Sequence, residues 1–372
     1  MYFDLRPKVV REDLFDRDRE LELFTRYVSE KSSLVVLTGL RRVGKTSLLL
    51  VGLNMVEQPY VYIDLRGLGP NTSYRDLYNR ISDGLEKMVR RYSGLWSSIK
   101  RYLSRVRGIG IAGFSISLSW RRDRVDLVQL FERLNDWASD HGYVFTIVFD
   151  EVQRIRSPLT RYLAEVISYC YDYLRNTVVI TSGSEAGLLY RFLGSKDPEH
   201  PLYGRYYRVV HLDPLSRSDS LLFLEEGFRQ YGLSLPSDTL EYVVDRLDGV
   251  IGWLVVYGCR AIDTGDCSKR LVDKVLEEAY SLAISELNHL LETRPRESRE
   301  RYIFVLKAIA RGYNTWSSIK RFVEERIGKT LSDSILYNML VNLVELNIIE
   351  KNEETGVYSI RDPVLRHGLA RE

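Results

Sequence analysis

The sequence predicts an α/β fold in which helices cover both faces of a parallel sheet, followed by two smaller, mainly helical domains. Three observations predict it. Short β-rich runs alternate with helical segments, a glycine-rich loop follows the first run, and an acidic pair ends the third run. The expected strands are residues 34–38, 60–65, 144–150, 178–182 and 207–212.

The loop after the first strand reads G-x-x-x-x-G-K-T over Gly39–Thr46. Such a P-loop turns a strand into a helix whose free N–H groups point at a polyphosphate. Lys45 is expected to reach the β- and γ-phosphates, and the hydroxyl of Thr46 to hold Mg²⁺. The predicted nucleotide-binding residues here are Gly39, Leu40, Arg41, Arg42, Val43, Gly44, Lys45, Thr46 and Ser47.

The third strand ends in Asp150-Glu151, the acidic pair that a P-loop requires. We expect Asp150 to hold the hydration shell of Mg²⁺ and Glu151 to act as a base for an attacking water. The alternative is an ordinary solvated turn. The pattern indicates ATP or ADP as ligand, with Mg²⁺ as cofactor.

The next strand ends at Ser182, which is a candidate for contact with the γ-phosphate or the attacking water. A simple strand-to-loop turn is the alternative at this position. Both carboxyl ends would lie at one edge of a parallel sheet, where the phosphate site is expected.

Composition describes an ordinary globular chain of 372 residues, with 45% hydrophobic residues and a net charge of +2. No apolar run approaches the length of a membrane span. The cysteines, Cys170, Cys259 and Cys267, lack metal-site spacing. We therefore expect free thiols, a cytoplasmic location and no membrane partner.

An insertion at about residues 75–125 separates the second and third strands. Alternation of apolar residues from Phe114 to Trp120 predicts a β-hairpin over residues 108–120. Within residues 87–122, aromatic side chains interleave with basic ones, which is typical of a nucleic-acid surface. The hypothesis is contact with nucleic acid or an acidic protein; the alternative is a solvated helical face. The basic residues are Lys87, Arg90, Arg91, Lys100, Arg101, Arg105, Arg107, Arg121 and Arg122, and the aromatic ones Tyr92, Trp96, Tyr102, Phe114 and Trp120.

The predicted domains are an ATPase core over residues 1–214, a helical lid over 215–293 and a winged helix over 294–372, with residues 294–296 as linker. Thr315 and Ser332 are expected to cap the second and third helices of the winged helix. Its third helix, residues 333–346, contains no Lys or Arg. Because phosphate contacts supply much of DNA affinity, a structural or regulatory lid is favoured over DNA binding, although Tyr337, Asn338 and Asn342 could read base edges.

Together these motifs resemble the archaeal ATPases of the AAA+/STAND type, P-loop proteins with an appended lid and winged helix. The resemblance rests on residues 13–21, the two Walker motifs, and residues 180–184, 201–205 and 249–254. It implies that Phe15 and Arg17 lie beside the adenine, although Arg17 could instead start a helix. It also implies that Gly252 belongs to a lid motif that contacts the nucleotide.

Arg205 lies where related ATPases often carry an arginine finger or sensor, acting within its own chain or on a neighbouring subunit. An ion-paired surface arginine is the alternative. Two positions depart from the resemblance: Ile251 stands where proline is usual, and Gly183 where signalling relatives often carry arginine.

The sequence thus predicts a Mg²⁺-dependent ATPase of low activity, whose nucleotide state controls the lid and the winged helix; an oligomer is compatible with this. The catalytic candidates are Glu151, Lys45, Arg205 and Ser182. One alternative is an ADP-locked signalling switch with negligible turnover. Another is a DNA-binding ATPase like replication initiators or proteins associated with mobile elements.

Overall fold

A computed structural model describes residues 1–69, 72–121, 124–195, 197–291 and 295–371. Contacts divide the chain into two compact units. We call the first the sheet unit, comprising Pro7–Arg41 and Lys45–Leu212. We call the second the helical unit, comprising Met1–Arg6, Arg42–Gly44 and Asp213–Glu372.

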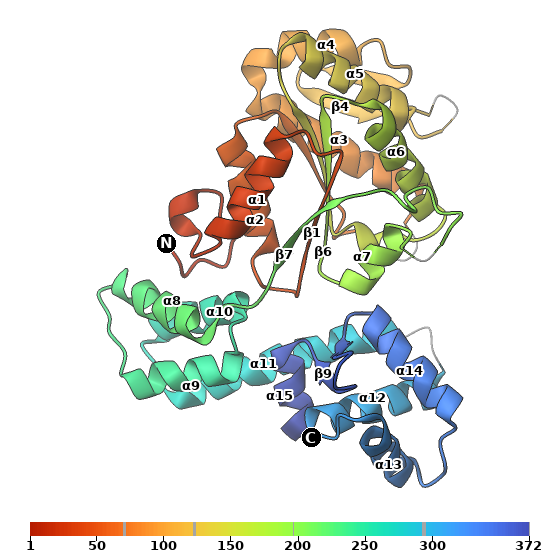
Figure 1. Ribbon diagram of the computed structural model, residues 1–372. Coiled ribbons are helices and arrows are strands. Elements are labelled where there is room, and N and C mark those ends of the chain that lie inside the picture. Colours follow the sequence, from red (N-terminus) through yellow and green to blue (C-terminus); the bar gives the residue numbers. More distant parts are fainter. Residues whose placement is uncertain (70–71, 122–123, 196, 292–294, 372) are drawn as a thin grey trace. The chain divides into compact units, whose positions relative to one another are not determined.

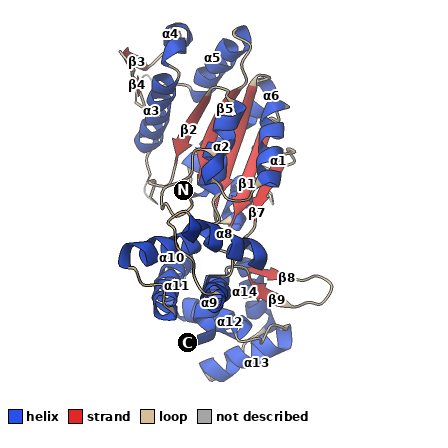
Figure 2. Ribbon diagram, turned by 90° about the vertical axis from the view of Figure 1, so that its left-hand side faces the viewer, coloured by secondary structure: helices blue, strands red, loops and turns tan. Residues whose placement is uncertain are grey.

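The sheet unit is built on a five-stranded parallel sheet with the strand order β2-β5-β6-β1-β7 (Figure 2). This confirms the predicted α/β class. The three middle strands are buried along their whole length, which explains their nearly continuous apolar sequences. The strands are β1 (Leu34–Gly39), β2 (Tyr60–Asp64), β5 (Phe145–Asp150), β6 (Thr177–Gly183) and β7 (Arg208–Leu212).

Strand register brings the predicted motifs to one edge of the sheet. Asp64 lies beside Asp150, Thr38 beside Gly183, and Gly39 beside Leu212. Since all five strands are parallel, their carboxyl ends meet at this edge, where α/β proteins bind ligands.

Helices α1 and α2 lie on one side of this sheet and α6 on the other (Figure 1). The buried residues of α1 are Leu21, Phe24 and Val28, at the spacing of one helical face. The helices of the sheet unit outside the insertion are α1 (Asp18–Ser29), α2 (Lys45–Val56), α5 (Leu127–Asp140), α6 (Leu159–Tyr173) and α7 (Ala186–Phe192), with the 3₁₀ turns η1 (Arg11–Asp13) and η3 (Val152–Arg154).

The insertion combines helices with the predicted hairpin. It contains α3 (Tyr74–Arg91), η2 (Ser93–Leu95), α4 (Trp96–Leu103), β3 (Ile109–Ala112) and β4 (Ser115–Leu118). The two strands pair antiparallel, which confirms the hairpin. Glu86 of α3 holds the hairpin against that helix, because its carboxylate accepts hydrogen bonds from the hydroxyl of Ser115 (2.6 Å) and the amide of Ile116 (2.9 Å).

The helical unit begins with the helices expected for residues 215–291: α8 (Arg217–Arg229), α9 (Ser237–Leu247), α10 (Ile251–Thr264) and α11 (Lys269–Leu291). The N-terminal Phe3 belongs to this unit. Its ring packs against Phe223 and Phe228 at centroid distances of 5.7 and 5.0 Å. Glycines at 227 and 258 leave room for that ring, since a Cβ at either would lie within 2.6 Å of it.

A winged helix completes the helical unit, as predicted. It contains α12 (Arg296–Ala310), α13 (Trp316–Ile327), α14 (Asp333–Glu345), β8 (Ile349–Lys351), β9 (Tyr358–Ile360) and α15 (Pro363–Arg371). Thr315 caps α13 in a capping box, and Gly328 ends that helix with a φ of 67°. Ser332 is the N-cap residue of α14, although its side chain makes no capping bond. Of the predicted linker, Arg294 lies outside the described residues.

Candidate active site

The P-loop leaves β1 through a glycine that no other residue can replace without strain. Gly39 has a φ of 146°, and a Cβ there would lie 2.3 Å from the carbonyl oxygen of Leu212. Gly44 has a φ of 98°, and α2 begins at the next residue. The two glycines of the motif therefore supply backbone geometry, as a phosphate loop requires.

Lys45 is buried, with 6% of its surface exposed. Its ammonium group donates to the carbonyl oxygens of Gly39 (2.9 Å) and Leu40 (2.6 Å). Burial lowers the pKa of Lys45 to about 8, while the negative charges of Glu151 and Asp150 oppose that shift. The lysine thus lies beside the acidic pair at the carboxyl end of β5.

Asp150 is only 1% exposed and is held by two hydroxyls. Tyr62 of β2 and Ser182 of β6 each donate to one of its carboxylate oxygens. Burial raises the pKa of Asp150, and the two hydroxyl donors work against that rise. Burial, followed by the neighbouring charge of Asp150, also raises the pKa of Tyr62. The tyrosine therefore stays a neutral donor.

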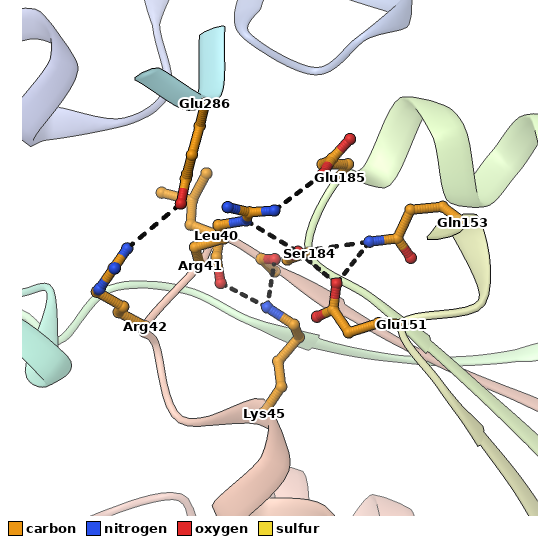
Figure 3. Close-up of polar contacts among 10 residues, drawn as sticks. Leu40, Arg41, Arg42, Lys45, Glu151, Gln153, Ser184, Glu185 and Glu286 are labelled. Atoms are coloured by element: carbon orange, nitrogen blue, oxygen red, sulfur yellow. Dashed lines mark hydrogen bonds and ion pairs between the residues drawn. The ribbon is translucent and has the colours of Figure 1, made fainter. Parts of the chain in front are cut away.

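Glu151 follows in a left-handed conformation, with a φ of 57°. Its Oε2 accepts from Nε2 of Gln153 (2.6 Å) and from Oγ of Ser184 (2.8 Å), as Figure 3 shows. The guanidinium of Arg41 reaches the same group, because its Nε donates to Ser184 Oγ (3.4 Å) and its second nitrogen pairs with Glu185 (3.1 Å). These contacts join the P-loop, the acidic pair and the segment that follows β6.

The oxygen donors present suit Mg²⁺, a hard cation that keeps several waters in nucleotide sites. Thr46 is half-buried at the second position of α2, and Asp150 is a buried carboxylate with no cationic hydrogen-bond partner among the described residues. Among the same residues there is no cluster of three or more His, Cys, Asp or Glu that could bind a metal. This fits an ion held by one hydroxyl, water and phosphate oxygens.

Four further predicted residues belong to the sheet unit: Ser182, Ser47, Phe15 and Arg17. Ser182 is fully buried and directs its hydroxyl at Asp150, while also accepting from the amide of Glu151 (3.1 Å). Ser47 accepts from the amide of Lys8 (3.1 Å). Phe15 and Arg17 are buried, and Arg17 precedes α1 and pairs with Glu20 (3.3 Å). Their contact with adenine stays a prediction.

Arg205 does not lie near the P-loop or the acidic pair of its own chain. It lies before β7, at the amino-terminal edge of the sheet, about 15 Å of strand away from the P-loop. Its guanidinium binds Asp172 (2.6 Å) and the carbonyl of Pro201. In this structure Arg205 therefore does not lie at the P-loop of its own chain, and its role as a finger or sensor stays a prediction.

Within the helical unit, Gly252 contacts the loop residue Arg42. Its amide donates to the carbonyl of Arg42 (2.8 Å), and a Cβ at 252 would lie 2.6 Å from Arg42 Cβ. The guanidinium of Arg42 lies 4.4 Å from the ring centroid of Trp253 and 3.8 Å from Oε1 of Glu286, the pair drawn in Figure 3. Ile251, where the resemblance expects proline, is the first residue of α10.

Sequence reasoning missed Tyr62, Gln153, Ser184 and Glu185 as members of the site. Two signals were available. Gln153 follows the acidic pair by two residues in a chain with only four glutamines, and Ser184 comes two residues after the predicted strand 178–182. Tyr62 carried no such signal, because an aromatic residue in a buried strand is normally core.

The fold and this site define a P-loop ATPase with a C-terminal winged helix. Comparison with known proteins gives the family: the model of the ATPase domain predominantly from Archaea matches residues 14–256. The chain belongs to that family. It is also similar to the Walker-type ATPase PABY2304 of Pyrococcus abyssi, with 35% identity, 99% of both chains covered and a TM-score of 0.81.

Other comparisons add detail on the fold. The model of the C-terminal winged helix-turn-helix domain of MCM proteins matches residues 296–360. The Aeropyrum pernix ORC2 protein, in ADPNP–ADP complexes, has 15% identity and a TM-score of 0.62, with 99% of this chain and 95% of that chain covered. At that identity the likeness concerns the fold alone. The comparison with curated proteins gives no match.

In the described part of the chain, no helix combines the length and apolar character that crossing a bilayer requires. The thiol of Cys170 is buried, and all three cysteines are free. A cytoplasmic location stays a prediction from the sequence.

Proposed function

We propose that this chain is a Mg²⁺-dependent, AAA+/STAND-like regulatory ATPase that hydrolyses ATP slowly. The observation that carries the proposal is the placement of Glu151 and Asp150 beside the buried ammonium group of Lys45. In the free chain that ammonium group binds the loop carbonyls of Gly39 and Leu40. Bound β- and γ-phosphates would offer it stronger, charged acceptors.

Each residue then has a defined task. The loop amides and Lys45 bind the phosphates, and Thr46 and Asp150 would hold Mg²⁺, which neutralises charge on the transferring phosphoryl group. Glu151 orients a water and takes its proton as the oxygen of that water bonds to phosphorus and the bond to ADP breaks. Tyr62 and Ser182 keep Asp150 in place by donating to it.

Regulation is proposed to run through Arg42. This loop residue bonds Gly252 of α10 through its backbone and pairs with Glu286 of α11 through its side chain. A change in loop conformation on binding or hydrolysis would alter both contacts. Nucleotide state would thereby bias the position of the lid helices and of the winged helix that follows α11.

The test is phosphate release by the purified chain with ATP, with and without Mg²⁺. Glu151→Gln should bind ATP normally and lose turnover by about 10²-fold or more, because the base is removed but the charge-binding loop stays intact. Glu199→Gln, at an exposed glutamate, is the matched control. Turnover equal in wild type and Glu151→Gln would remove Glu151 from the mechanism. Wild-type turnover no higher than background, with co-purified ADP and normal binding, would disprove hydrolysis and favour the ADP-locked switch.

A second function, contact with nucleic acid, is favoured by the surface of the insertion. We call this surface the basic face, and its members are all exposed: Lys87, Arg90, Arg91, Lys100, Arg101, Arg105, Arg107 and Arg121; Arg122 lies outside the described residues. Among the described residues, no carboxylate lies within ion-pair distance of Lys100, Arg101 or Arg105. Phe114 is 39% exposed at the hairpin turn, 5.9 Å from the ring of Trp96.

Exposed cations beside partly exposed rings are what a nucleic-acid backbone and its bases bind. The winged helix is less suited to binding nucleic acid, since α14 has no basic residue and exposes the apolar or aromatic side chains of Ile335, Tyr337 and Val344. Its wing also exposes Glu350, Glu353 and Glu354, which would repel phosphates. The basic face, rather than α14, is therefore the proposed contact.

Titration of labelled single-stranded and duplex DNA against salt tests this proposal. Reversing Arg101, Arg105 and Arg107 to Glu should abolish binding or lower the salt slope by about 2 to 3. Reversing Arg19, Arg75 and Arg270, exposed arginines elsewhere, is the control and should change little. Equal DNA binding by both triple variants would disprove the proposal. No DNA binding by wild type would leave an acidic protein as the partner to test.

A further inference from the structure

The carboxylate of Glu151 is held through only one of its two oxygens. Both Gln153 Nε2 and Ser184 Oγ donate to Oε2, at 2.6 and 2.8 Å. Among the described residues, nothing donates to Oε1. Glu151 also has a left-handed backbone, with a φ of 57°, which is uncommon for a residue other than glycine. The direction of Oε1 is thus determined by its neighbours.

Arg41 determines which way the hydroxyl of Ser184 points. A guanidinium can only donate, so Ser184 Oγ must accept from Arg41 Nε at 3.4 Å. The single proton of that hydroxyl is then left for Glu151. Arg41 is itself oriented by its ion pair with Glu185 at 3.1 Å, and Figure 3 shows this chain of contacts from the P-loop to Glu151.

Gln153 is only 4% exposed and has no freedom to turn away. Its Oε1 lies against Gly183, and that oxygen has no hydrogen-bond partner among the described residues. Leaving a buried amide oxygen unpaired is costly. The structure keeps this glutamine in place although only its Nε2 makes hydrogen bonds, to Glu151 and, at 3.5 Å, to Ser184.

We infer that Gln153 and Ser184 are positioning residues for the general base, and that Arg41 links them to the phosphate loop. They hold Oε2 of Glu151 and leave Oε1 free to take the proton of the attacking water. This inference rests on the proposed hydrolysis of ATP. In that reaction the water oxygen bonds to the γ-phosphorus, the bond to the ADP oxygen breaks, and Oε1 later releases the proton to solvent.

Gln153→Met tests the role of the amide, because methionine has a similar shape but cannot donate. With a misdirected base, kcat should fall about 10- to 100-fold, while the KM for ATP and the affinity for ATP stay within about twofold. Ser184→Ala should act in the same direction, and Ser184→Thr, which keeps a hydroxyl, should restore most of the rate. Gln129→Met, the same change at a half-buried glutamine of α5, is the control.

A double-variant cycle separates positioning from general support of the fold. In the Glu151→Gln background there is no base to position, so adding Gln153→Met should cost no further turnover. A full, additive loss in that background would overturn the inference. Should Gln153→Met fail to fold, as judged by thermal unfolding, Gln153→Ala replaces it in the same cycle.

The outcomes distinguish this inference from the proposed function. If Glu151→Gln abolishes turnover while Gln153→Met and Ser184→Ala keep the wild-type kcat, the ATPase function stands and the inference is wrong. If wild-type turnover does not exceed background, the function and the inference fail together. A selective fall in kcat, with the Thr rescue at Ser184, supports both.

Discussion

The side chain of Gln153 fills the place that a side chain on Gly183 would take: a Cβ on Gly183 would lie 2.6 Å from Oε1 of Gln153. The same Cβ would also lie 3.1 Å from Cβ of Leu189. Any side chain at position 183 would therefore displace the glutamine that contacts Glu151. Glycine at position 183 therefore leaves the space that the Gln153 side chain needs.

Gly183→Ala is expected to lower kcat by roughly 10-fold, because the new methyl group pushes Gln153 away from Glu151. Steady-state ATP hydrolysis measures the effect. In the Gln153→Ala background the 2.6 Å approach to the glutamine is removed, so the same substitution should cost little further activity. An equal loss in both backgrounds would show that Gly183 acts independently of Gln153.

Lys45 should take up protons when ATP binds. Burial lowers its pKa to about 8 in the free chain, so about half of the molecules carry a neutral lysine at pH 8. Phosphate charge favours the ammonium form, and binding at pH 8 should therefore take up roughly half a proton per site. Calorimetry in buffers with different ionisation enthalpies measures this uptake.

Lys45→Arg is the control for that measurement, because arginine stays charged and should bind without uptake. The pH dependence of the free energy of unfolding tests the direction of the Lys45 pKa shift independently. The pKa of Lys45 is lower in the folded protein than in the unfolded chain. Between about pH 8 and 10.5 the unfolded chain therefore binds more protons than the folded protein. As a result, Lys45 makes the free protein more stable as pH rises through that window. Binding at pH 8 with no proton uptake would contradict the lowered pKa.

Gly39→Ala should prevent the P-loop from binding ATP by straining its backbone, without changing any charge. Its φ of 146° and the 2.3 Å approach of a Cβ to the Leu212 carbonyl leave no strain-free place for a methyl group. We expect a loss of about 2 to 4 kcal/mol in the free energy of unfolding and loss of ATP binding. Denaturant unfolding measures the first; Gly142→Ala, at a turn glycine with nothing within 4 Å of its Cβ, should cost less.

Arg205→Ala should leave turnover of the isolated chain unchanged, since this residue lies at the edge of the sheet opposite the P-loop and binds Asp172. The informative measurement is kcat against protein concentration. If another copy supplies Arg205, wild-type kcat will rise with concentration and the variant will not. A low kcat of the variant at every concentration would contradict the placement of Arg205 away from its own site.

Gly252→Ala should weaken the contact between α10 and the loop residue Arg42. A Cβ there would lie 2.6 Å from Cβ and 2.9 Å from the carbonyl oxygen of Arg42, so the loop or the helix must shift. We expect ATP affinity to fall about 10-fold, as measured by titration with a fluorescent nucleotide. Gly258→Ala would disturb α10 against Phe3 instead, and unchanged ATP affinity in that variant makes it the matched control.

The sequence by itself determined the sheet, the P-loop, the acidic pair, the hairpin and the winged helix. These follow from local rules: buried strands need apolar runs, phosphate loops need glycines at strained positions, and helix caps need particular residues. Lys45, Asp150 and Glu151 could be named because their spacing relative to strand ends is local.

Only the tertiary structure decided what surrounds those residues. Tyr62, Ser182 and Ser184 reach the acidic pair because strand order places β2 and β6 on either side of β5, and strand order is not written in any single segment. The same register placed Arg205 at the far edge. Contacts between residues far apart in sequence depend on how strands pair, and that pairing is set by burial of the whole core.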